Sequence, residues 1–209
     1  MTMASSGAAM TGAAEGAGEA GAAVRHPTRA IQLVNFAVFQ AAWFAAVLGA
    51  AHHIPLWGTA CVVAALGWHL GVSARPAQEA RLIGSVCLIG FAVETGNALL
   101  GYVRYPSGQP DPYLAPYWMV ALWGLLAIAL NVTMRWLKRR PWLAALLGAV
   151  AGPASFASGV RLGGAQFVHA TPALVTMAVT WAVLMPVLMR LSERFDGVAV
   201  PPDPRVPHG

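Results

Sequence analysis

Six apolar stretches of about 20 residues follow one another along this chain, with only short polar connectors between them. A helix needs roughly 20 apolar residues to cross the hydrocarbon core of a bilayer, and in lipid each span must satisfy its own backbone hydrogen bonds. The pattern therefore predicts an all-α polytopic membrane protein, a bundle of about six transmembrane helices. The predicted spans lie near residues 30–51, 54–73, 82–103, 116–137, 141–163 and 170–191.

The composition supports this class and narrows the alternatives. Hydrophobic residues make up 57% of the 209 and charged residues only 10%, whereas a soluble domain carries roughly 25% charged residues. The short connectors leave no room for a second, soluble domain. The net charge of +5 does not indicate nucleic-acid binding, because the basic residues flank apolar runs, where they orient helices.

The positions of Lys and Arg predict the orientation of the chain. With the N-terminus inside, all of the 13 basic residues except Arg104 and Arg161 fall on the cytoplasmic side, as the positive-inside rule requires. Six spans then place both termini in the cytoplasm. The Ala/Gly-rich residues 1–29 and the Pro-rich residues 196–209 are predicted to be disordered tails around a transmembrane domain at 30–195.

A carboxylate, Glu94, lies near the middle of the third apolar run. Cys87, Gly90, Glu94, Asn97 and Gly101 are spaced by three or four residues, so they share one face of the predicted helix. This face is small and polar and the opposite one is bulky and apolar, so we expect Glu94 to face other helices rather than lipid. An ionisable group in a span is a candidate functional site; a structural role, protonated or ion-paired, is the alternative.

Arg161, toward the outer end of the fifth run, is the only basic residue well inside a predicted span. Its side chain could pair with Glu94, as a proton relay or an inert clasp, or it could extend outward to the membrane interface. Ser158 lies one turn before it on the same face. Glu94, Asn97, Arg161 and Ser158 are therefore the candidate intramembrane polar site.

Small residues recur along the fifth run and predict close packing between helices. They are Gly148, Gly152, Ser155, Gly159 and Gly163. Pro153 follows Gly152 and should kink the helix, because proline removes a backbone hydrogen bond. Tight packing is the simpler interpretation, and a hinge or a discontinuous helix beside a cavity is the alternative.

Asn35, His69 and Asn131 fall at similar depth, close to the cytoplasmic boundary, when each span is drawn at 1.5 Å per residue. This inner-leaflet polar cluster could join helices by hydrogen bonds, or it could form the floor of a pocket. The histidines of the outer turns lack Cys, Asp or Glu at ligand spacing, so no metal site is predicted. Catalytic and nucleotide-binding motifs are absent from the sequence, and we expect neither catalytic residues nor a cofactor.

Five stretches of the sequence resemble a known family. They are "NFAVFQAAWFAAVLGAA" at 35–51, "WHL" at 68–70, "PYWMVALWGLLAIALNVTMRWL" at 116–137, "LLGAVAGPASFASGVRLGGA" at 146–165 and "RFDG" at 194–197. Over about residues 30 to 197 the chain is similar to the bacterial integral membrane family called domain of unknown function 2878. The resemblance implies a multi-pass protein of the bacterial inner (cytoplasmic) membrane with no assigned activity. It also implies a lipid-related context, because such genes are often found beside cyclopropane-fatty-acid-synthase-like methyltransferases and flavin-dependent oxidases that act on lipid acyl chains.

Three functions remain open at this point. The first is a non-catalytic partner that assists a peripheral lipid-modifying enzyme at the cytoplasmic face, where the basic loop at 135–140 could meet anionic headgroups or an acidic partner. The second is a small transporter or lipid translocase that uses Glu94, Asn97 and Arg161. The third, a membrane enzyme acting on lipid, has the least support, because one carboxylate without a placed base, metal or nucleophile is no catalytic constellation. The predicted partners are the lipid bilayer and, for the first function, a peripheral lipid-modifying enzyme at the cytoplasmic face.

Overall fold

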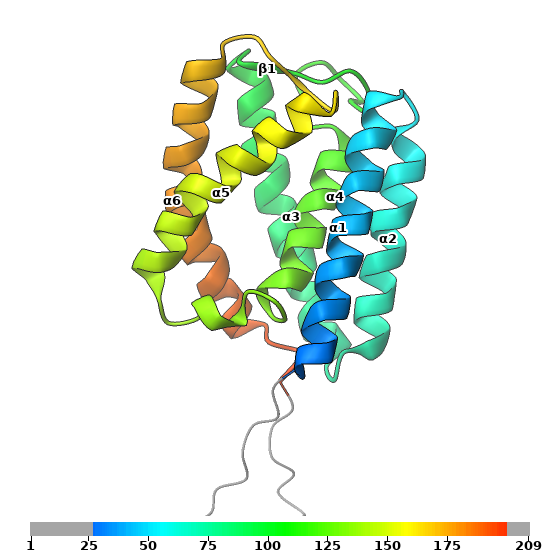
Figure 1. Cartoon of the computed structure of the whole chain (residues 1–209), viewed down its shortest axis with the longest axis vertical. Helices are drawn as coiled ribbons and strands as arrows, with labels where there is room; N and C mark the ends of the chain where they lie inside the picture. The colour runs from blue at the N-terminus through cyan, green and yellow to red at the C-terminus, as the bar shows by residue number, and fades with distance from the viewer. Residues whose placement is uncertain (1–26, 200–209) are drawn as a thin grey trace, which may run out of the picture.

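The computed structural model describes residues 27–199, which form six α-helices, one short 3-10 helix and one pair of two-residue strands (Figure 1). In chain order these are α1 (Arg29–Ala51), α2 (Pro55–Val72), α3 (Pro76–Leu99), β1 (Val103–Arg104), α4 (Tyr117–Leu130), η1 (Arg135–Leu137), α5 (Pro141–Arg161), β2 (Gln166–Phe167) and α6 (Ala170–Arg194). All of the helices except α4 are long and apolar enough to span a membrane. The predicted all-α membrane class is confirmed.

Four helices, α1, α2, α5 and α6, begin and end within three residues of the predicted spans. Prolines mark several of the starts: Pro55, Pro76 and Pro141 occupy the first turn of their helices, where the missing N–H has no intrahelical partner to lose. Thr28 caps α1 by accepting a hydrogen bond from the backbone of Ile31. Local sequence signals therefore set these boundaries.

The third span differs from the prediction at both ends. α3 begins at Pro76 rather than at residue 82, because the acidic Glu79 is not part of a solvated connector but is fully buried, with 0% of its surface exposed. The helix ends at Leu99. Gly101, predicted to lie on the polar face of the helix, instead follows it with a left-handed φ of 67°.

The fourth span is also shorter than predicted. α4 ends at Leu130 rather than at residue 137, and the chain continues through turns into η1. Its 14 residues cover roughly 21 Å at 1.5 Å per residue, less than the ~30 Å hydrocarbon core. The polar side chains of Asn131 and Thr133, which follow at once, make their hydrogen bonds with other segments at this end of the bundle. η1 and its turns thus take the place of the missing helical turns.

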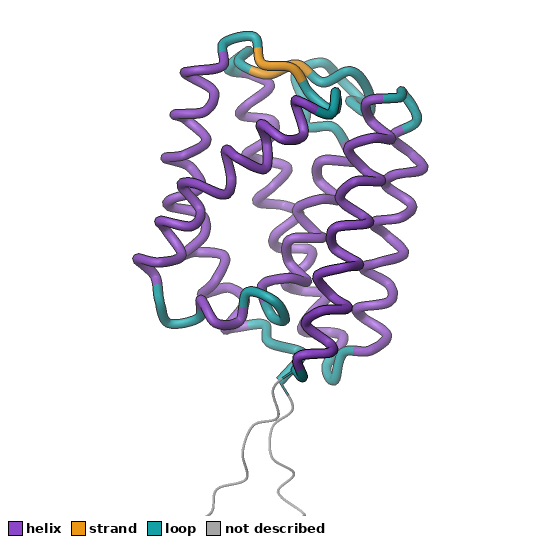
Figure 2. Tube along the Cα trace, viewed as in Figure 1, coloured by secondary structure: helices purple, strands orange, loops and turns teal. Residues whose placement is uncertain are grey.

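The helices fall into two groups. α4 packs against α1, α2 and α3, and α1 packs along α2, whereas α5 packs mainly on α6. Figure 1 shows α5 running obliquely across the front of the bundle. At one end of the molecule β1 pairs with β2 in antiparallel fashion, Val103 opposite Phe167, and this pairing ties the segment after α3 to the α5–α6 connection (orange in Figure 2).

The two ends of the described chain lie at the same end of the bundle (Figure 1). An even number of crossings has this geometry. We call this the inner end, following the predicted orientation, and the opposite end the outer end. Most of the two predicted tails, residues 1–26 and 200–209, lies outside the described residues. Gly197, within the predicted C-terminal tail, is buried, and its backbone N–H donates to Glu79 on α3.

Candidate functional site

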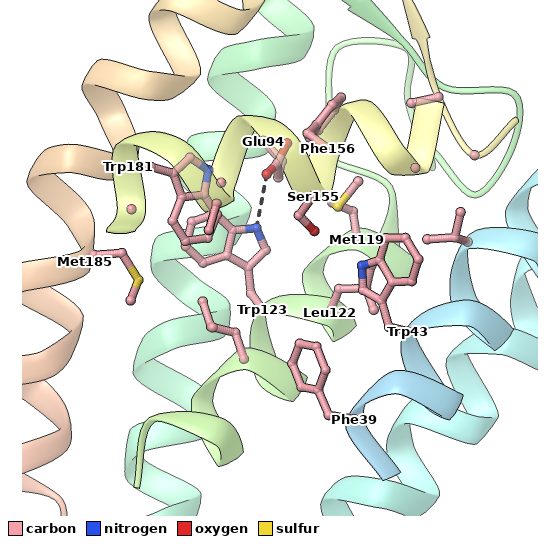
Figure 3. A pocket seen from close by; sticks show the side chains of 18 of the residues that line it. Phe39, Trp43, Glu94, Met119, Leu122, Trp123, Ser155, Phe156, Trp181 and Met185 are labelled. Carbon is pink, nitrogen blue, oxygen red and sulfur yellow. Dashed lines mark hydrogen bonds between the residues drawn. The ribbon is translucent and has the colours of Figure 1, made fainter. Parts of the chain in front are cut away.

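Glu94 on α3 is held from three directions. Its side chain is only 3% exposed. One carboxylate oxygen accepts hydrogen bonds from the Asn97 amide at 3.1 Å and the Tyr105 hydroxyl at 2.9 Å. The other oxygen accepts one from the indole nitrogen of Trp123 on α4 at 3.1 Å (Figure 3). Glu94 therefore faces other parts of the protein and not lipid, as its helix face predicted.

Tyr105 lies outside the helices, in the outer segment between β1 and α4, and it is buried. Burial raises the pKa of its phenol, and the nearby Glu94 carboxylate raises the pKa further. The hydroxyl therefore keeps its proton and remains a hydrogen-bond donor to Glu94. Asn97, predicted as part of the same site, contacts Glu94 one turn along α3.

The Trp123 ring that Glu94 orients is one half of a stacked pair. The rings of Trp123 and of Trp181 on α6 lie parallel within 16°, with 4.9 Å between their centres. A methyl group on Gly90 of α3 would overlap the Trp123 ring, and one on Gly152 of α5 would overlap the Trp181 ring. Four helices therefore form one aromatic wall, which we call the tryptophan wall. The two tryptophans form its stacked pair, and Gly90 and Gly152 leave room for their rings.

The tryptophan wall bounds a cavity of about 230 Å³. Residues of α1, α3, α4, α5 and α6 line it, and all of its side chains are aromatic, methionine or aliphatic except those of Glu94 and Ser155 (Figure 3). The aromatic residues are Phe39, Trp43, Trp118, Trp123, Phe156 and Trp181. We call this space the aromatic cavity. It suits an apolar ligand with few polar groups.

A second cavity of about 440 Å³ adjoins the first and shares Phe39, Trp43 and Ser155 with it. It lies between α1 and α5, and the other residues that line it include Gln40, Phe44, Ser158, Arg161 and Leu162. Because several of these side chains are exposed, this space is a groove on the side of the bundle, between α1 and α5. We call it the α1–α5 groove.

The hypothesised ion pair between Glu94 and Arg161 is not formed. The partners of Glu94 are Asn97, Tyr105 and Trp123, as described above, while Arg161 lines the α1–α5 groove. Within residues 27–199 the guanidinium has no carboxylate partner within 4 Å. Ser158, the fourth member of the predicted site, lines the same groove and donates to the Ala154 carbonyl at 2.8 Å.

The small residues of α5 have different roles. Gly148 and Gly152 contact α6 so closely that any side chain would collide with Trp181 or Met185, so the predicted tight packing holds there. A methyl group on Gly159 would meet nothing within 4 Å, and Gly163 follows the end of α5 with a φ of 87°. No neighbour therefore packs closely on Gly159, whereas a methyl group on Gly163 would lie 3.2 Å from the Ala51 side chain at the end of α1.

The inner-leaflet polar cluster is organised by a residue that sequence reasoning missed. His69 Nε2 lies 2.8 Å from Glu79 Oε2, and the amide of Asn131 donates to Glu79 Oε1 at 2.7 Å. The backbone N–H of Gly197 donates to the same oxygen at 2.7 Å. Glu79 thus joins α2, α4 and the segment after α6. Its signal was its place in the first turn after Pro76, where helices favour acidic residues.

Asn35, predicted as the third member, is buried at 1% exposure on α1. Its side-chain oxygen accepts a hydrogen bond from Thr133 at 3.2 Å rather than from His69 or Asn131. Its Nδ2 atom has no hydrogen-bond partner within the described chain. The predicted cluster is therefore two neighbouring groups, one around Glu79 and one between Asn35 and Thr133.

Asp196 engages much of the basic loop at the inner end. Arg135 and Lys138 contact the same carboxylate oxygen at 2.5 and 2.8 Å. Burial acts to raise the pKa of Asp196, but the hydrogen bonds from these two cations outweigh it and hold the pKa well below its usual range. Burial also lowers the pKa of Lys138, against the opposing effect of Asp196. Arg139 and Arg140 remain exposed.

A family model described as "Protein of unknown function (DUF2878)" matches residues 32–187. The chain belongs to this family. The match extends from the first turn of α1 into α6 and so covers the tryptophan wall, both cavities and Glu79. No curated protein and no solved structure matches the chain. For this DUF2878 protein, function must therefore be inferred from its own geometry.

The described part of this DUF2878 chain holds no group of three or more His, Cys, Asp or Glu side chains placed to bind a metal ion. Glu94 and Glu79 are each fully engaged by donors from the protein. Glu94 accepts from Asn97, Tyr105 and Trp123, and Glu79 contacts His69, Asn131 and the Gly197 backbone, so each carboxylate joins separate segments of the fold by hydrogen bonds.

Proposed function

We propose that this membrane protein is a non-catalytic binding protein for an apolar ligand of the lipid acyl-chain class, which it holds in the aromatic cavity. The tryptophan wall carries the proposal. It fixes one side of the cavity with two large stacked rings, and Glu94 sets the orientation of one of them by a hydrogen bond.

The chemistry of the lining supports a hydrocarbon ligand. Aromatic faces and methionine side chains offer dispersion contacts and few hydrogen bonds. The carboxylate of Glu94 already accepts three hydrogen bonds from the protein, so a ligand does not have to supply a donor to it. An acyl chain entering from the bilayer would replace one apolar environment by another and gain contact with the rigid rings.

A role in membrane-lipid modification is the wider context of the proposal. A protein that holds an acyl chain could present it to a peripheral lipid-modifying enzyme at the inner face. Arg139 and Arg140 are the residues of the basic loop that such an enzyme or anionic headgroups would meet, because Asp196 engages Arg135 and Lys138.

Transport or translocation of lipid is the second candidate, and one observation favours it. The α1–α5 groove adjoins the aromatic cavity and opens on the outer surface of the bundle, which gives a ligand a lateral route between the cavity and the bilayer. On this proposal Glu94 and Asn97 support the wall of the route, and Arg161 lies at its entrance.

Filling the cavity tests the binding proposal. Gly159 lines the aromatic cavity and has open space around it, so Gly159→Leu should occupy the cavity without a backbone collision. In nanodiscs, a long-chain fatty alcohol carrying a diazirine should label wild-type protein at cavity residues, and the variant should lose this labelling. Gly67→Leu, on an exposed part of α2 with equally open space, is the control. Equal cavity labelling of all three proteins would contradict the proposal.

A further inference from the structure

The α1–α5 groove is rich in hydrogen-bond donors whose acceptors are missing. Arg161, Gln40, Trp43 and Ser155 all line it, and these exposed or half-buried side chains make no hydrogen bond to another group within residues 27–199. In Figure 3 the Ser155 hydroxyl and the Trp43 ring extend into the same space. Arg and the Trp indole can only donate, and the Ser hydroxyl and the Gln amide can do so as well. The groove is therefore complementary to an acceptor.

The charge in the groove points to an anion. Its described lining contains one cation, Arg161, and no acidic side chain. An arginine in a membrane span is costly and is normally paired with a counter-charge or directed to water. Arg161 has no carboxylate within 4 Å among the described residues. A negatively charged group of a ligand would supply the partner that the described residues do not.

Arg161 is exposed and lines the α1–α5 groove from the last residue of α5. α5 ends at Arg161, and the side chains of an α-helix tilt toward its N-terminus, which here means toward the inner end of the bundle. Arg161 accordingly shares its groove with Gln40, which is near the middle of the 23-residue helix α1. A carboxylate or phosphate held there would sit beside the aromatic cavity.

We propose that the α1–α5 groove binds the anionic headgroup of an amphiphile whose hydrocarbon chain occupies the adjoining aromatic cavity, with Arg161 pairing the carboxylate or phosphate. This inference rests on the proposed acyl-chain binding and adds the class of ligand: a fatty acid or another single-chain anionic lipid, not a neutral one. Gln40, Ser155 and the Trp43 indole supply the remaining donors to the headgroup oxygens. The shared Phe39, Trp43 and Ser155 side chains are the junction where headgroup and chain meet.

A matched pair of probes tests the headgroup. Wild-type protein in nanodiscs of neutral lipid is titrated with a long-chain fatty acid and with the fatty alcohol of the same length, each carrying the same diazirine. The fatty acid should label the cavity at lower concentration than the alcohol. Loss of a charge-assisted hydrogen bond in Arg161→Gln should weaken fatty-acid labelling roughly tenfold and leave the alcohol unchanged.

Two further variants sharpen the result. Arg161→Lys keeps the charge but not the planar double hydrogen bond, so its affinity for the fatty acid should fall between those of wild type and Arg161→Gln. Arg104→Gln removes the other basic residue assigned to the outer side, an exposed one on β1 that lines neither cavity, and should behave as wild type. A single-chain phosphate monoester in competition shows whether phosphate is accepted as well as carboxylate, while inorganic phosphate should not compete because it has no chain.

The outcomes separate this inference from the binding proposal itself. If acid and alcohol label equally and Arg161→Gln changes neither, the anionic headgroup is wrong while acyl-chain binding stands. If Gly159→Leu leaves the labelling by both probes intact, acyl-chain binding fails and this inference fails with it. Should Gly159→Leu not fold, Ser155→Leu fills the junction from an exposed position of α5 and takes its place.

Discussion

Glu94 accepts hydrogen bonds from three side chains, and two of those donors, Trp123 and Tyr105, are themselves placed by aromatic packing. Trp123 is fixed by its stack on Trp181, and Tyr105 is buried against Trp118 and Phe156. A residue with such partners acts on a ligand through the shape of the wall rather than through its own charge. Glu94 is therefore a positioning residue in the proposed site.

Glu94→Gln should lower the stability of the folded protein by about 1–3 kcal/mol, because one side of the new amide would present N–H groups to the N–H donors of Asn97 or Trp123. Thermal unfolding in detergent measures this, with the exposed Asp111→Asn as control. A variant as stable as wild type would show that the carboxylate does not hold the wall together.

Asp196→Asn should lower the melting temperature at neutral pH. The pKa of Asp196 is depressed in the folded protein, so its contribution to stability is complete above the unfolded pKa of about 4 and is lost as the pH falls through the folded value. The difference in melting temperature between wild type and variant should therefore narrow below about pH 4. A difference that stays constant down to pH 3 or lower would contradict this account, and Asp111→Asn again serves as control.

At the scale of elements, α5 is the helix whose neighbours differ most along its length. Its inner half packs on α6 through Gly148 and Gly152, which also line the aromatic cavity, whereas in its outer half a methyl group on Gly159 would meet no atom within 4 Å and Arg161 lines the α1–α5 groove. One helix thus combines a tight contact with an open lining. Gly148 and Gly152 serve both close packing and the cavity wall, and α5 runs unbroken through Pro153, without the discontinuity that was the alternative interpretation.

The same substitution at two positions of α5 should therefore act in opposite directions. Gly148→Ala forces a methyl group against the Trp181 backbone and should destabilise the protein by about 1–3 kcal/mol. Gly159→Ala meets no atom and should be neutral or stabilising by up to about 1 kcal/mol, since alanine favours the helix. Unfolding of both variants in one detergent measures the contrast, and equal losses would show that α5 does not pack as described.

Four of the helices were predictable almost to the residue, because prolines, charges and apolar length mark their ends in the local sequence. The buried position of Glu79 was not predictable, since it depends on His69, Asn131 and Gly197, which are distant in sequence. The C-terminal end of α4 was missed for a similar reason, because an apolar run does not reveal that the Asn131 side chain donates to Glu79 on another helix. The polar face around Glu94 was recognisable by its spacing, but its partner Trp123 and the glycines that make room for the rings required the fold.

At the scale of the whole molecule, the orientation in the membrane remains a prediction that labelling can test. In a variant without native cysteines, Asp111→Cys in the outer segment should react with an impermeant maleimide in intact cells, and Arg139→Cys should react only after the membrane is opened. Both positions are exposed. Labelling of Arg139→Cys in intact cells would show that the protein has the opposite orientation, with the basic loop on the outer face.

The contact between Gly197 and Glu79 also sets an order of events during synthesis. The two residues are 118 positions apart, so at about 5–20 residues per second the ribosome finishes the partner several to roughly twenty seconds after the acid. Until then the Glu79 side chain of the nascent chain lacks its backbone donor, the Gly197 N–H. The inner end of the bundle is thus completed last, by the segment that leaves the ribosome after the final span.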